Sequence, residues 1–143
     1  MKRMLRCTPF PLLDGSCAEA MTFYHEGLGG ELTLTELGGT PMKDMFPPKK
    51  HKRLIHANLK SGNIEISATD GMADPEYEPK QGDPYAIFVI GAGHEELKAV
   101  FNKLAKGAKK DRFQDLHDMP FGTYGQSCDR YGVHWIFKGD KKE

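Results

Sequence analysis

The sequence predicts an α+β fold built from two βαβββ modules, and two observations support this prediction. Two helical patterns of apolar residues begin about 78 residues apart. Each pattern is followed by a strand, a loop and a strand hairpin in the same order. The expected modules are residues 1–72 and 83–139 of one domain spanning residues 1–143. Their strands are expected to form a curved mixed sheet shaped as a cup, with the helices on its convex side.

The first module is expected to begin with a strand over residues 3–10, which Pro9 and Pro11 close. A helix follows, because Ser16 and Glu19 have the spacing of a capping box, in which each side chain bonds the backbone N–H of the other. One face of this helix is apolar, and its residues are Ala20, Phe23, Tyr24 and Leu28. The pair Gly29-Gly30 is expected to end the helix.

The rest of the first module is expected to be strand and loop. Residues 31–37 alternate apolar and polar side chains and predict a strand, whereas residues 38–52, rich in Gly, Pro and Lys, predict a mobile loop. Residues 53–60 and 63–69 are predicted to form a hairpin that turns at Ser61-Gly62. One face of this hairpin is apolar, and the opposite face is polar and titratable.

The second module repeats this order after residues 70–84, a long segment that links the modules, covers a pocket, or does both. A strand is predicted over residues 85–90, a helix over 94–105 and a strand over 109–114. The apolar positions of the helix are Leu97, Val100, Phe101 and Leu104. The last hairpin pairs residues 121–128 with 133–137, and its turn uses Gly132 for a positive φ.

The composition argues against several kinds of partner. The 20 basic and 20 acidic residues of the 143-residue chain cancel, so no surplus positive charge favours nucleic acid. No apolar run approaches the length of a membrane span, and none suits a signal peptide. The three cysteines lack CxxC spacing and are predicted to be free thiols, which indicates a cytoplasmic protein.

The polar face of the first hairpin supplies the candidate catalytic residues, Glu65 and His56. A carboxylate in a central strand needs a partner, and His56 is the candidate partner of Glu65. Asn58 and Ser67 share this face on the strand alternation and are candidate substrate contacts. The alternative for His56 is a histidine at the edge of the core, held by a hydrogen bond.

The last hairpin supplies three more candidate substrate contacts. Tyr124 offers a hydroxyl group, with a packed tyrosine as the alternative, and His134 faces the cup on the strand alternation or lies in solvent. Trp135, the only tryptophan, shares the opposite face with Val133 and Phe137. Both core packing and substrate stacking are open for Trp135.

Three motifs resemble the vicinal oxygen chelate superfamily, which includes glyoxalase I, extradiol dioxygenases and bleomycin-resistance proteins. They are FYHEGLGGE (residues 23–31), HANLKSGNIEIS (residues 56–67) followed by Asp70, and MPFGTYGQSCDRYGVHWIF (residues 119–137). The second and third are most similar to the PhnB-like branch. The resemblance covers nearly the whole chain and implies paired βαβββ modules, a cup-shaped site for a small molecule and a homodimer.

In metal-dependent members of that superfamily, four His, Gln or Glu side chains on the cup face bind one divalent ion. The resemblance places the four ligand positions at Pro9, near Glu65, at Tyr85 or Ala86, and at Ile136, so only Glu65 keeps a ligand type. It therefore implies that the four-ligand centre is absent and that no cofactor is needed. A rearranged divalent-metal site made of His56, Glu65 and His134 stays open.

Three functions follow from the resemblance. The leading one is a PhnB-like, glyoxalase-like domain that binds or converts a small molecule in the cup without the four-ligand metal centre. The second is a divalent-metal-dependent lyase, isomerase or dioxygenase, in which the ion polarises a substrate oxygen. The third is a drug-sequestering protein of the bleomycin-resistance type.

Overall fold

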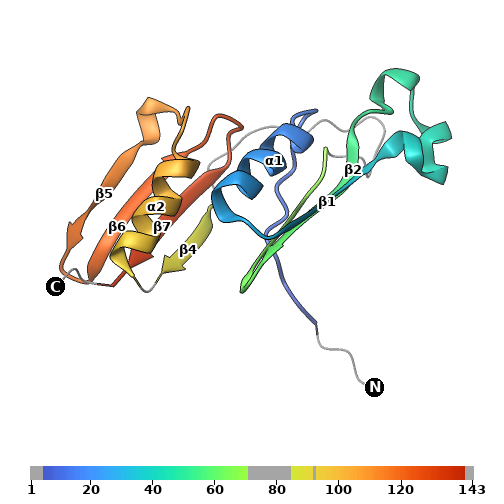
Figure 1. Cartoon of the computed structure of the whole chain (residues 1–143). Coiled ribbons are helices and arrows are strands. Elements are labelled where there is room, and N and C mark those ends of the chain that lie inside the picture. The colour runs from blue at the N-terminus through green and yellow to red at the C-terminus, as the bar shows by residue number, and fades with distance from the viewer. Residues whose placement is uncertain (1–4, 71–84, 92, 141–143) are drawn as a thin grey trace. The chain divides into compact units, whose positions relative to one another are not determined.

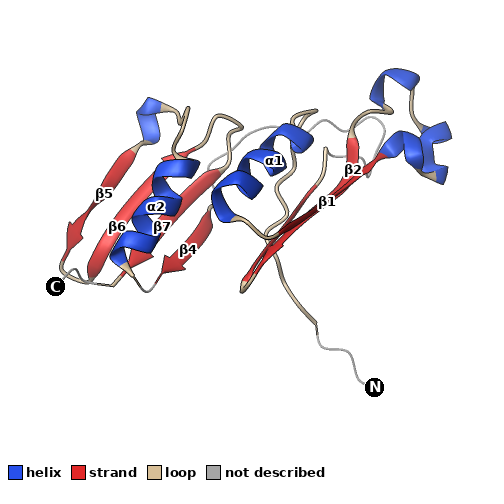
Figure 2. Cartoon of the chain, in the orientation of Figure 1, coloured by secondary structure: helices blue, strands red, loops and turns tan. Residues whose placement is uncertain are grey.

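The computed structural model describes residues 5–70, 85–91 and 93–140 and contains two long helices and seven strands within them (Figures 1 and 2). The elements are α1 (Cys17–Leu28), β1 (Glu31–Glu36), the 3-10 turns η1 (Leu37–Gly39), η2 (Pro41–Met45) and η3 (Pro48–Lys50), β2 (Leu54–Ser61), β3 (Ile64–Ala68), β4 (Ile87–Gly91), α2 (His94–Leu104), the 3-10 turn η4 (Lys110–Arg112), β5 (Gln114–Met119), β6 (Gly122–Cys128) and β7 (His134–Gly139). None of the described helices is long and apolar enough to cross a membrane.

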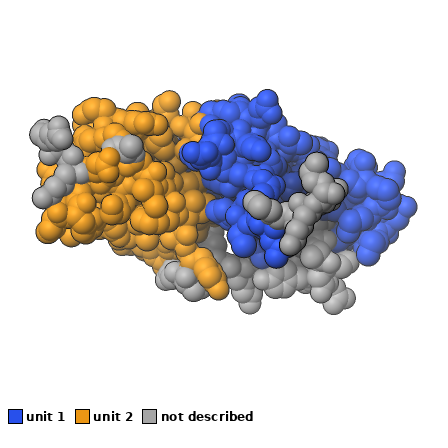
Figure 3. All heavy atoms as spheres, turned by 90° about the horizontal axis from the view of Figure 1, so that it is seen from below, with its two compact units in different colours: residues 1–25, 29–80 blue, residues 26–28, 81–143 orange. Residues whose placement is uncertain are grey.

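The chain divides into two compact units, shown in different colours in Figure 3. The first unit comprises residues 1–25 and 29–80, and the second comprises residues 26–28 and 81–143. The predicted linker over residues 70–84 lies outside the described residues except for Asp70. The two predicted hairpins and both predicted helices are confirmed, with ends that agree within two residues.

The first unit contains an antiparallel sheet in the order β1-β2-β3. The expected strand over residues 3–10 is wrong within its described part, residues 5–10, which has no strand geometry. Instead, the end of this segment and the residues after it run beside β3: the Pro9 and Pro11 carbonyl groups accept from the N–H groups of Ser67 (3.1 Å) and Thr69 (3.2 Å). Because proline has no N–H, Pro9 and Pro11 can only accept, and a bond in the return direction comes from Leu13 N–H, which donates to the Thr69 carbonyl group at 2.9 Å.

Helix α1 begins at the predicted residue but is capped in a different way. The Ser16 side chain makes no capping hydrogen bond, so the predicted capping box is wrong. The buried Asp70 carboxylate accepts from the N–H groups of Gly15 (2.9 Å) and Cys17 (3.0 Å) through Oδ1, and from Leu54 N–H (2.8 Å) through Oδ2. A negative charge at a helix N-terminus is favourable, so Asp70 ties the start of α1 to the start of β2.

Residues 38–52, which were expected to be a mobile loop, contain short 3-10 turns. They contain η2, η3 and most of η1, and they enclose a small apolar cluster in which Leu37 and Phe46 are buried against Met42 and Ile55. The His51 ring bonds the carbonyl groups of Lys43 (2.8 Å) and Phe46 (3.1 Å). Proline residues at the first positions of η2 and η3 set the φ angles that such short turns require.

The second unit contains a mixed sheet in the order β4-β7-β6-β5, with β4 parallel to β7 and the other pairs antiparallel. The first unit has the same pattern, because Leu12 forms a parallel bridge with Thr69, just beyond the last strand of that unit. In each unit, therefore, the first extended segment lies parallel to the end of the last one, with a helix between them in sequence. This arrangement confirms a βαβββ pattern used twice.

The expected strand over residues 109–114 is displaced along the chain. Residues 110–112 form η4, and β5 begins at Gln114. This edge strand is exposed at both ends, and its sequence QDLHDM has no run of alternating apolar residues that would reveal it. Its register with β6 also shifts between Gln114 and His117.

Helix α2 covers one face of the second sheet (Figure 1). Phe101 packs edge-on against Phe137 of β7 with ring centroids 5.0 Å apart, and the buried helix residues are Leu97, Phe101 and Leu104. Along β7 the odd positions Trp135 and Phe137 are buried, and the even positions His134 and Ile136 are partly exposed. The opposite face of the sheet therefore carries His134, Ile136 and their neighbour Gln126 of β6.

Candidate functional site

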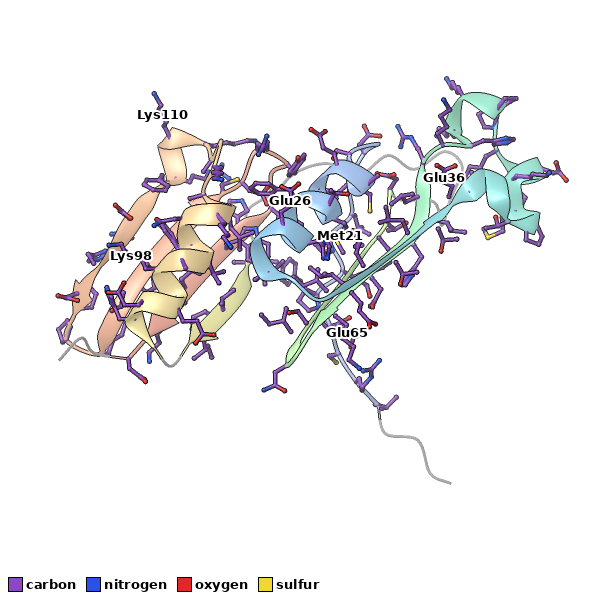
Figure 4. The ribbon with its side chains drawn as sticks, in the orientation of Figure 1. Met21, Glu26, Glu36, Glu65, Lys98 and Lys110 are labelled. Carbon is purple, nitrogen blue, oxygen red and sulfur yellow. The ribbon has the colours of Figure 1, made fainter. Side chains whose placement is uncertain are left out.

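Glu65 lies at the centre of a polar network on the first unit. Its carboxylate accepts from Arg6 Nη1 (2.9 Å) through Oε1 and from Asn58 Nδ2 (3.1 Å) through Oε2. The same Asn58 amide group donates to Ser67 Oγ at 2.9 Å. Figure 4 labels Glu65 where the N-terminal segment passes the β2–β3 hairpin. Three of the candidate residues, Asn58, Glu65 and Ser67, are thus brought together.

The expected pairing of His56 with Glu65 is wrong. Glu65 faces Lys60 in the hairpin register, four positions from His56, which is about 13 Å along a strand. The exposed His56 instead lies beside the ring of Phe10, with centroids 6.3 Å apart. The partner of Glu65 is Arg6. The sequence indicated only that this carboxylate needs a cation or hydrogen-bond donors, and it did not identify Arg6.

A cavity of about 310 Å³ lies in the second unit. It lies beside the start of β7 and the end of β6. The residues that precede β4 also contribute to its wall. Its walls combine apolar, aromatic, amide and charged side chains, a mixture typical of sites for small organic molecules. The lining residues are Tyr85, Ala86, Asp111, Arg112, Gln126, Ser127, His134, Trp135 and Ile136.

Arg112 and His134 form the polar wall of this cavity. Arg112 Nη1 lies 3.0 Å from His134 Nε2. A guanidinium group has only donors, so His134 Nε2 must accept, and in this arrangement the ring carries its proton on Nδ1. Arg112 Nε also lies 3.8 Å from Asp111 Oδ2 in an exposed ion pair. The sequence identified His134 but not Arg112, because η4 lies where a strand was predicted.

The other two candidates of the second unit lie apart from this polar wall. Tyr124 is half-buried, and its ring meets His117 (6.1 Å) and Phe121 (6.0 Å) edge-on. Trp135 is 1% exposed and donates from Nε1 to Asp129 Oδ2 at 2.9 Å. Core packing of Trp135, one of the two alternatives, is therefore observed, although Trp135 also borders the cavity.

The buried Ser127 hydroxyl group has no hydrogen-bond partner among the described residues. Ser127 faces Trp135 across the β6–β7 pair, and so belongs to the core face rather than to the face of Gln126 and Ile136. An unpaired hydroxyl group in the core lowers stability.

The residues at the inherited ligand positions do not fit a metal ion. The Pro9 side chain has no ligand atom, Ala86 and Ile136 line the cavity with hydrocarbon, and Tyr85, the alternative third position, offers a single phenol oxygen. Glu65 is engaged by Arg6 and Asn58. Within the described ranges, no group of three or more His, Cys, Asp and Glu residues is placed to hold an ion. A divalent site needs several such donors at once, so no reaction step is assigned to a metal.

The three cysteines are free thiols, as predicted. Burial, with the Asp70 carboxylate as the second cause, raises the pKa of the Cys17 thiol to about 12. Burial also raises the pKa of the Cys128 thiol. Because the thiolate is the reactive form, neither buried cysteine is suited to be a nucleophile.

Comparison with known proteins identifies the family. Residues 4–135 match the Glyoxalase/Bleomycin resistance protein/Dioxygenase superfamily. No curated protein sequence matches the chain.

Solved structures share the fold over nearly the whole chain. A protein from Pseudomonas aeruginosa is 27% identical, with a TM-score of 0.83 over 97% of this chain and 100% of that one. A protein from Bacillus cereus described as a putative 3-demethylubiquinone-9 3-methyltransferase, PhnB protein, is 23% identical, with a TM-score of 0.68 over 94% and 99% of the two chains. A glyoxylase/bleomycin resistance protein/dioxygenase domain from Frankia is 18% identical, with a TM-score of 0.55 over 99% of each chain.

The PhnB protein shares the fold of this chain. The family match covers most of both units and ends at residue 135, the second residue of β7. The chain therefore belongs to the glyoxalase/bleomycin resistance protein/dioxygenase superfamily.

Proposed function

We propose that this chain binds a small organic molecule in the cavity of the second unit and does so without a four-ligand metal centre. One observation carries the proposal. The third and fourth ligand positions implied by the resemblance, Tyr85 or Ala86 and Ile136, all line that cavity. Two of the four positions at which the resemblance places metal ligands therefore border a hollow, and Ala86 and Ile136 make part of its wall apolar.

The size and lining of the cavity support binding of a small molecule. Its volume of about 310 Å³ is at the lower end of ordinary ligand sites. Ile136 and Ala86 offer apolar contact, whereas Gln126 and His134 offer polar groups that would orient a ligand. The Glu65 network of the first unit is a second polar surface, with Asn58 and Ser67 as its proposed ligand contacts.

The metal-dependent alternative makes a different demand on the chain. A rearranged site would need His56, Glu65 and His134 to act together, and His56 and Glu65 are four positions apart in register. Metal analysis of the purified protein separates the two functions. Less than one-tenth of an ion per chain agrees with the proposal, and one tightly held divalent ion per chain refutes it.

The test of binding is an amide-shift screen of the ¹⁵N-labelled protein with a library of small organic molecules. Ligands are expected to shift the amide signals of Gln126, His134 and Ile136. Ala86→Phe should fill the cavity mouth and weaken this binding at least tenfold. Ala99→Phe, on the exposed face of α2, is the matched control and should leave binding within twofold. The proposal is refuted if the ligands bind Ala86→Phe as tightly as they bind Ala99→Phe. It is also refuted if the ligands shift only amide signals of residues outside the cavity.

We also propose a homodimer and a reducing, cytoplasmic setting. The dimer rests on the family resemblance, and the setting is supported by the three free thiols. Sedimentation velocity should give a particle of twice the 16.0 kDa chain mass. A monomer throughout the micromolar range would contradict the dimer.

A further inference from the structure

We propose that the Glu65 network, formed by Arg6, Asn58, Glu65 and Ser67, binds a neutral ring-shaped polyol such as a pyranose sugar, with the C–H face of the sugar on the Phe10 ring. The proposal rests on the proposed role of Asn58 and Ser67 as ligand contacts and adds the chemical class of the ligand. It starts from the hydrogen bonds within the network, because those bonds determine which donors and acceptors remain for a ligand.

The orientation of the Asn58 amide group is fixed by its two partners. Its Nδ2 atom donates to Glu65 Oε2 at 3.1 Å and to Ser67 Oγ at 2.9 Å. An ionised carboxylate can only accept, so the amide nitrogen and not the amide oxygen faces Glu65. Both N–H bonds of the amide group are thereby used. Within the described part of the chain no donor reaches Asn58 Oδ1, so this oxygen remains as an acceptor for a ligand.

Ser67 and Glu65 add one donor and further acceptors to this array. Ser67 Oγ accepts from Asn58, so its own O–H is left to donate, and among the described residues it has no acceptor. Each Glu65 oxygen accepts one bond, from Arg6 or from Asn58, and has a lone pair for another. Asn58 and Ser67 face each other across the β2–β3 pair. A donor beside an acceptor matches a hydroxyl group, which donates and accepts at the same atom.

The charges of the network favour a neutral ligand. Arg6 Nη1 lies 2.9 Å from Glu65 Oε1, so the two charges offset each other, and the Glu65 side chain is only 19% exposed. A cationic ligand would compete with Arg6 for the carboxylate, and an anionic ligand would meet the oxygen atoms of Glu65 and Asn58. The remaining acceptors therefore require donors that carry no charge, and a polyol brings several of these on neighbouring atoms.

Phe10 supplies apolar surface next to these polar groups. Its ring is 48% exposed and lies beside the His56 ring, with centroids 6.3 Å apart and an interplanar angle of 31°. His56 and Asn58 are two positions apart on β2 and so share its polar face. Phe10 directly follows Pro9, whose carbonyl group accepts from Ser67 N–H. A pyranose ring has an apolar C–H face and hydroxyl groups around its edge, so it can pack on Phe10 and bond Asn58 and Ser67 together.

The experiment titrates the ¹⁵N-labelled protein with the methyl glycosides of glucose, galactose and mannose. At least one of these neutral sugars should shift the amide signals of Asn58 and Ser67 with a dissociation constant of about 1–10 mM, the affinity expected from a few hydrogen bonds and one ring contact. The methyl glycosides of glucuronic acid and glucosamine test an anion and a cation, and tetrahydropyran tests a ring without hydroxyl groups. Each should bind roughly fivefold more weakly. Any of the three that binds as tightly as the neutral sugars overturns the assignment.

Phe10→Ala should weaken sugar binding roughly tenfold, whereas Phe10→Tyr, which keeps the ring, should bind within about twofold of the wild type. Phe88→Ala is the matched control, since it removes an exposed phenylalanine from β4 of the second unit, and it should leave sugar binding unchanged. Ser67→Ala should weaken binding roughly fivefold, because it removes the hydroxyl donor. Ser16→Ala is its control, since the Ser16 side chain makes no capping hydrogen bond.

The outcomes separate this site from the cavity of the second unit. Sugars that shift only the cavity amides overturn the site at the Glu65 network and support the proposed binding in the cavity. The inference also fails if no neutral sugar shifts the Asn58 and Ser67 amides below about 100 mM, or if Phe10→Ala and Phe88→Ala bind the sugar equally. Binding in the cavity is then judged by its own library screen, which these results leave unchanged.

Discussion

The indole Nε1 of Trp135 donates to Asp129 Oδ2 at 2.9 Å, and both side chains are buried. The other carboxylate oxygen, Oδ1, accepts from the backbone N–H groups of Tyr131 (2.9 Å) and Val133 (3.0 Å). One carboxylate thus fixes both the turn before β7 and the ring that borders the cavity. The only tryptophan of the chain is therefore held by the same turn motif that marks the family resemblance.

Asp129→Asn is expected to lower the free energy of unfolding by about 2–4 kcal/mol, because the new amide group would face one of the three donors that the carboxylate now accepts from. Denaturant unfolding followed by circular dichroism measures the change. Asp118→Asn, at an exposed position of β5, is the control and should change stability by less than about 0.5 kcal/mol. Equal effects of the two substitutions would show that the Asp129 bonds do not stabilise the fold.

Trp135→Phe should destabilise the protein as well, but less in the Asp129→Asn background than in the wild type. The reason is that the indole donor and the carboxylate share one bond, so the second substitution removes an interaction that is already lost. A double-mutant cycle measures the coupling, which we expect to be about 1–2 kcal/mol. Strict additivity would contradict the bond.

Asp70→Asn is expected to fray the start of α1 and to lower stability by about 2–3 kcal/mol, because Asp70 replaces the capping box that Ser16 and Glu19 do not form. Hydrogen exchange of the Cys17 amide should become faster. Glu19→Ala is the comparison, because it removes the side-chain acceptor that a capping box needs: if the capping box stabilised the helix, this substitution would have the larger effect.

The sequence predicts those parts of the fold that depend on neighbouring residues, and it does not predict contacts between residues far apart in the chain. Both helices and both hairpins follow from local periodicity and turn residues, and Gly132 has the predicted positive φ of 89°. The capping of α1 was not predictable in this way, since Asp70 is 53 positions from Cys17. Strand β5 was displaced because an exposed edge strand need not alternate apolar and polar residues.

The site was predictable in the same partial way. Strand alternation placed Asn58, Glu65 and Ser67 on one face, and they form one network. Alternation gives the face but not the register, so it could not exclude the His56–Glu65 pair. Arg6 and Arg112 come from irregular segments, where no periodicity indicates the direction of a side chain.

The thiols should differ in reactivity toward a disulfide reagent at pH 8. The exposed Cys7 should react at once, whereas the buried Cys17 and Cys128 should react only after unfolding, because burial raises the pKa of both. The measurement is the rate at which the reagent's thiol product appears, counted per protein chain. Fast release of more than one thiol per folded chain would contradict the burial of the other two.

The raised pKa of Cys17 also predicts a dependence of stability on pH. Folding raises the pKa of this thiol from its ordinary value of 9.0 to about 12. The contribution of the protonated Cys17 thiol to the free energy of unfolding is fully present below about pH 9. It is lost as the pH rises toward 12, because the thiol of the unfolded chain releases its proton first. The free energy of unfolding should therefore fall more steeply above pH 9 in the wild type than in Cys17→Ala. Parallel curves for the two proteins would contradict the raised pKa.

The central claim is that the cavity of the second unit binds small molecules and needs no metal ion to do so. The most direct measurement is an amide-shift titration of one library ligand, performed once with the chelated protein and once with added divalent ions. We predict the same dissociation constant in both and shifts at Gln126, His134 and Ile136. Binding that disappears in the chelated protein and returns with the ion would contradict the claim.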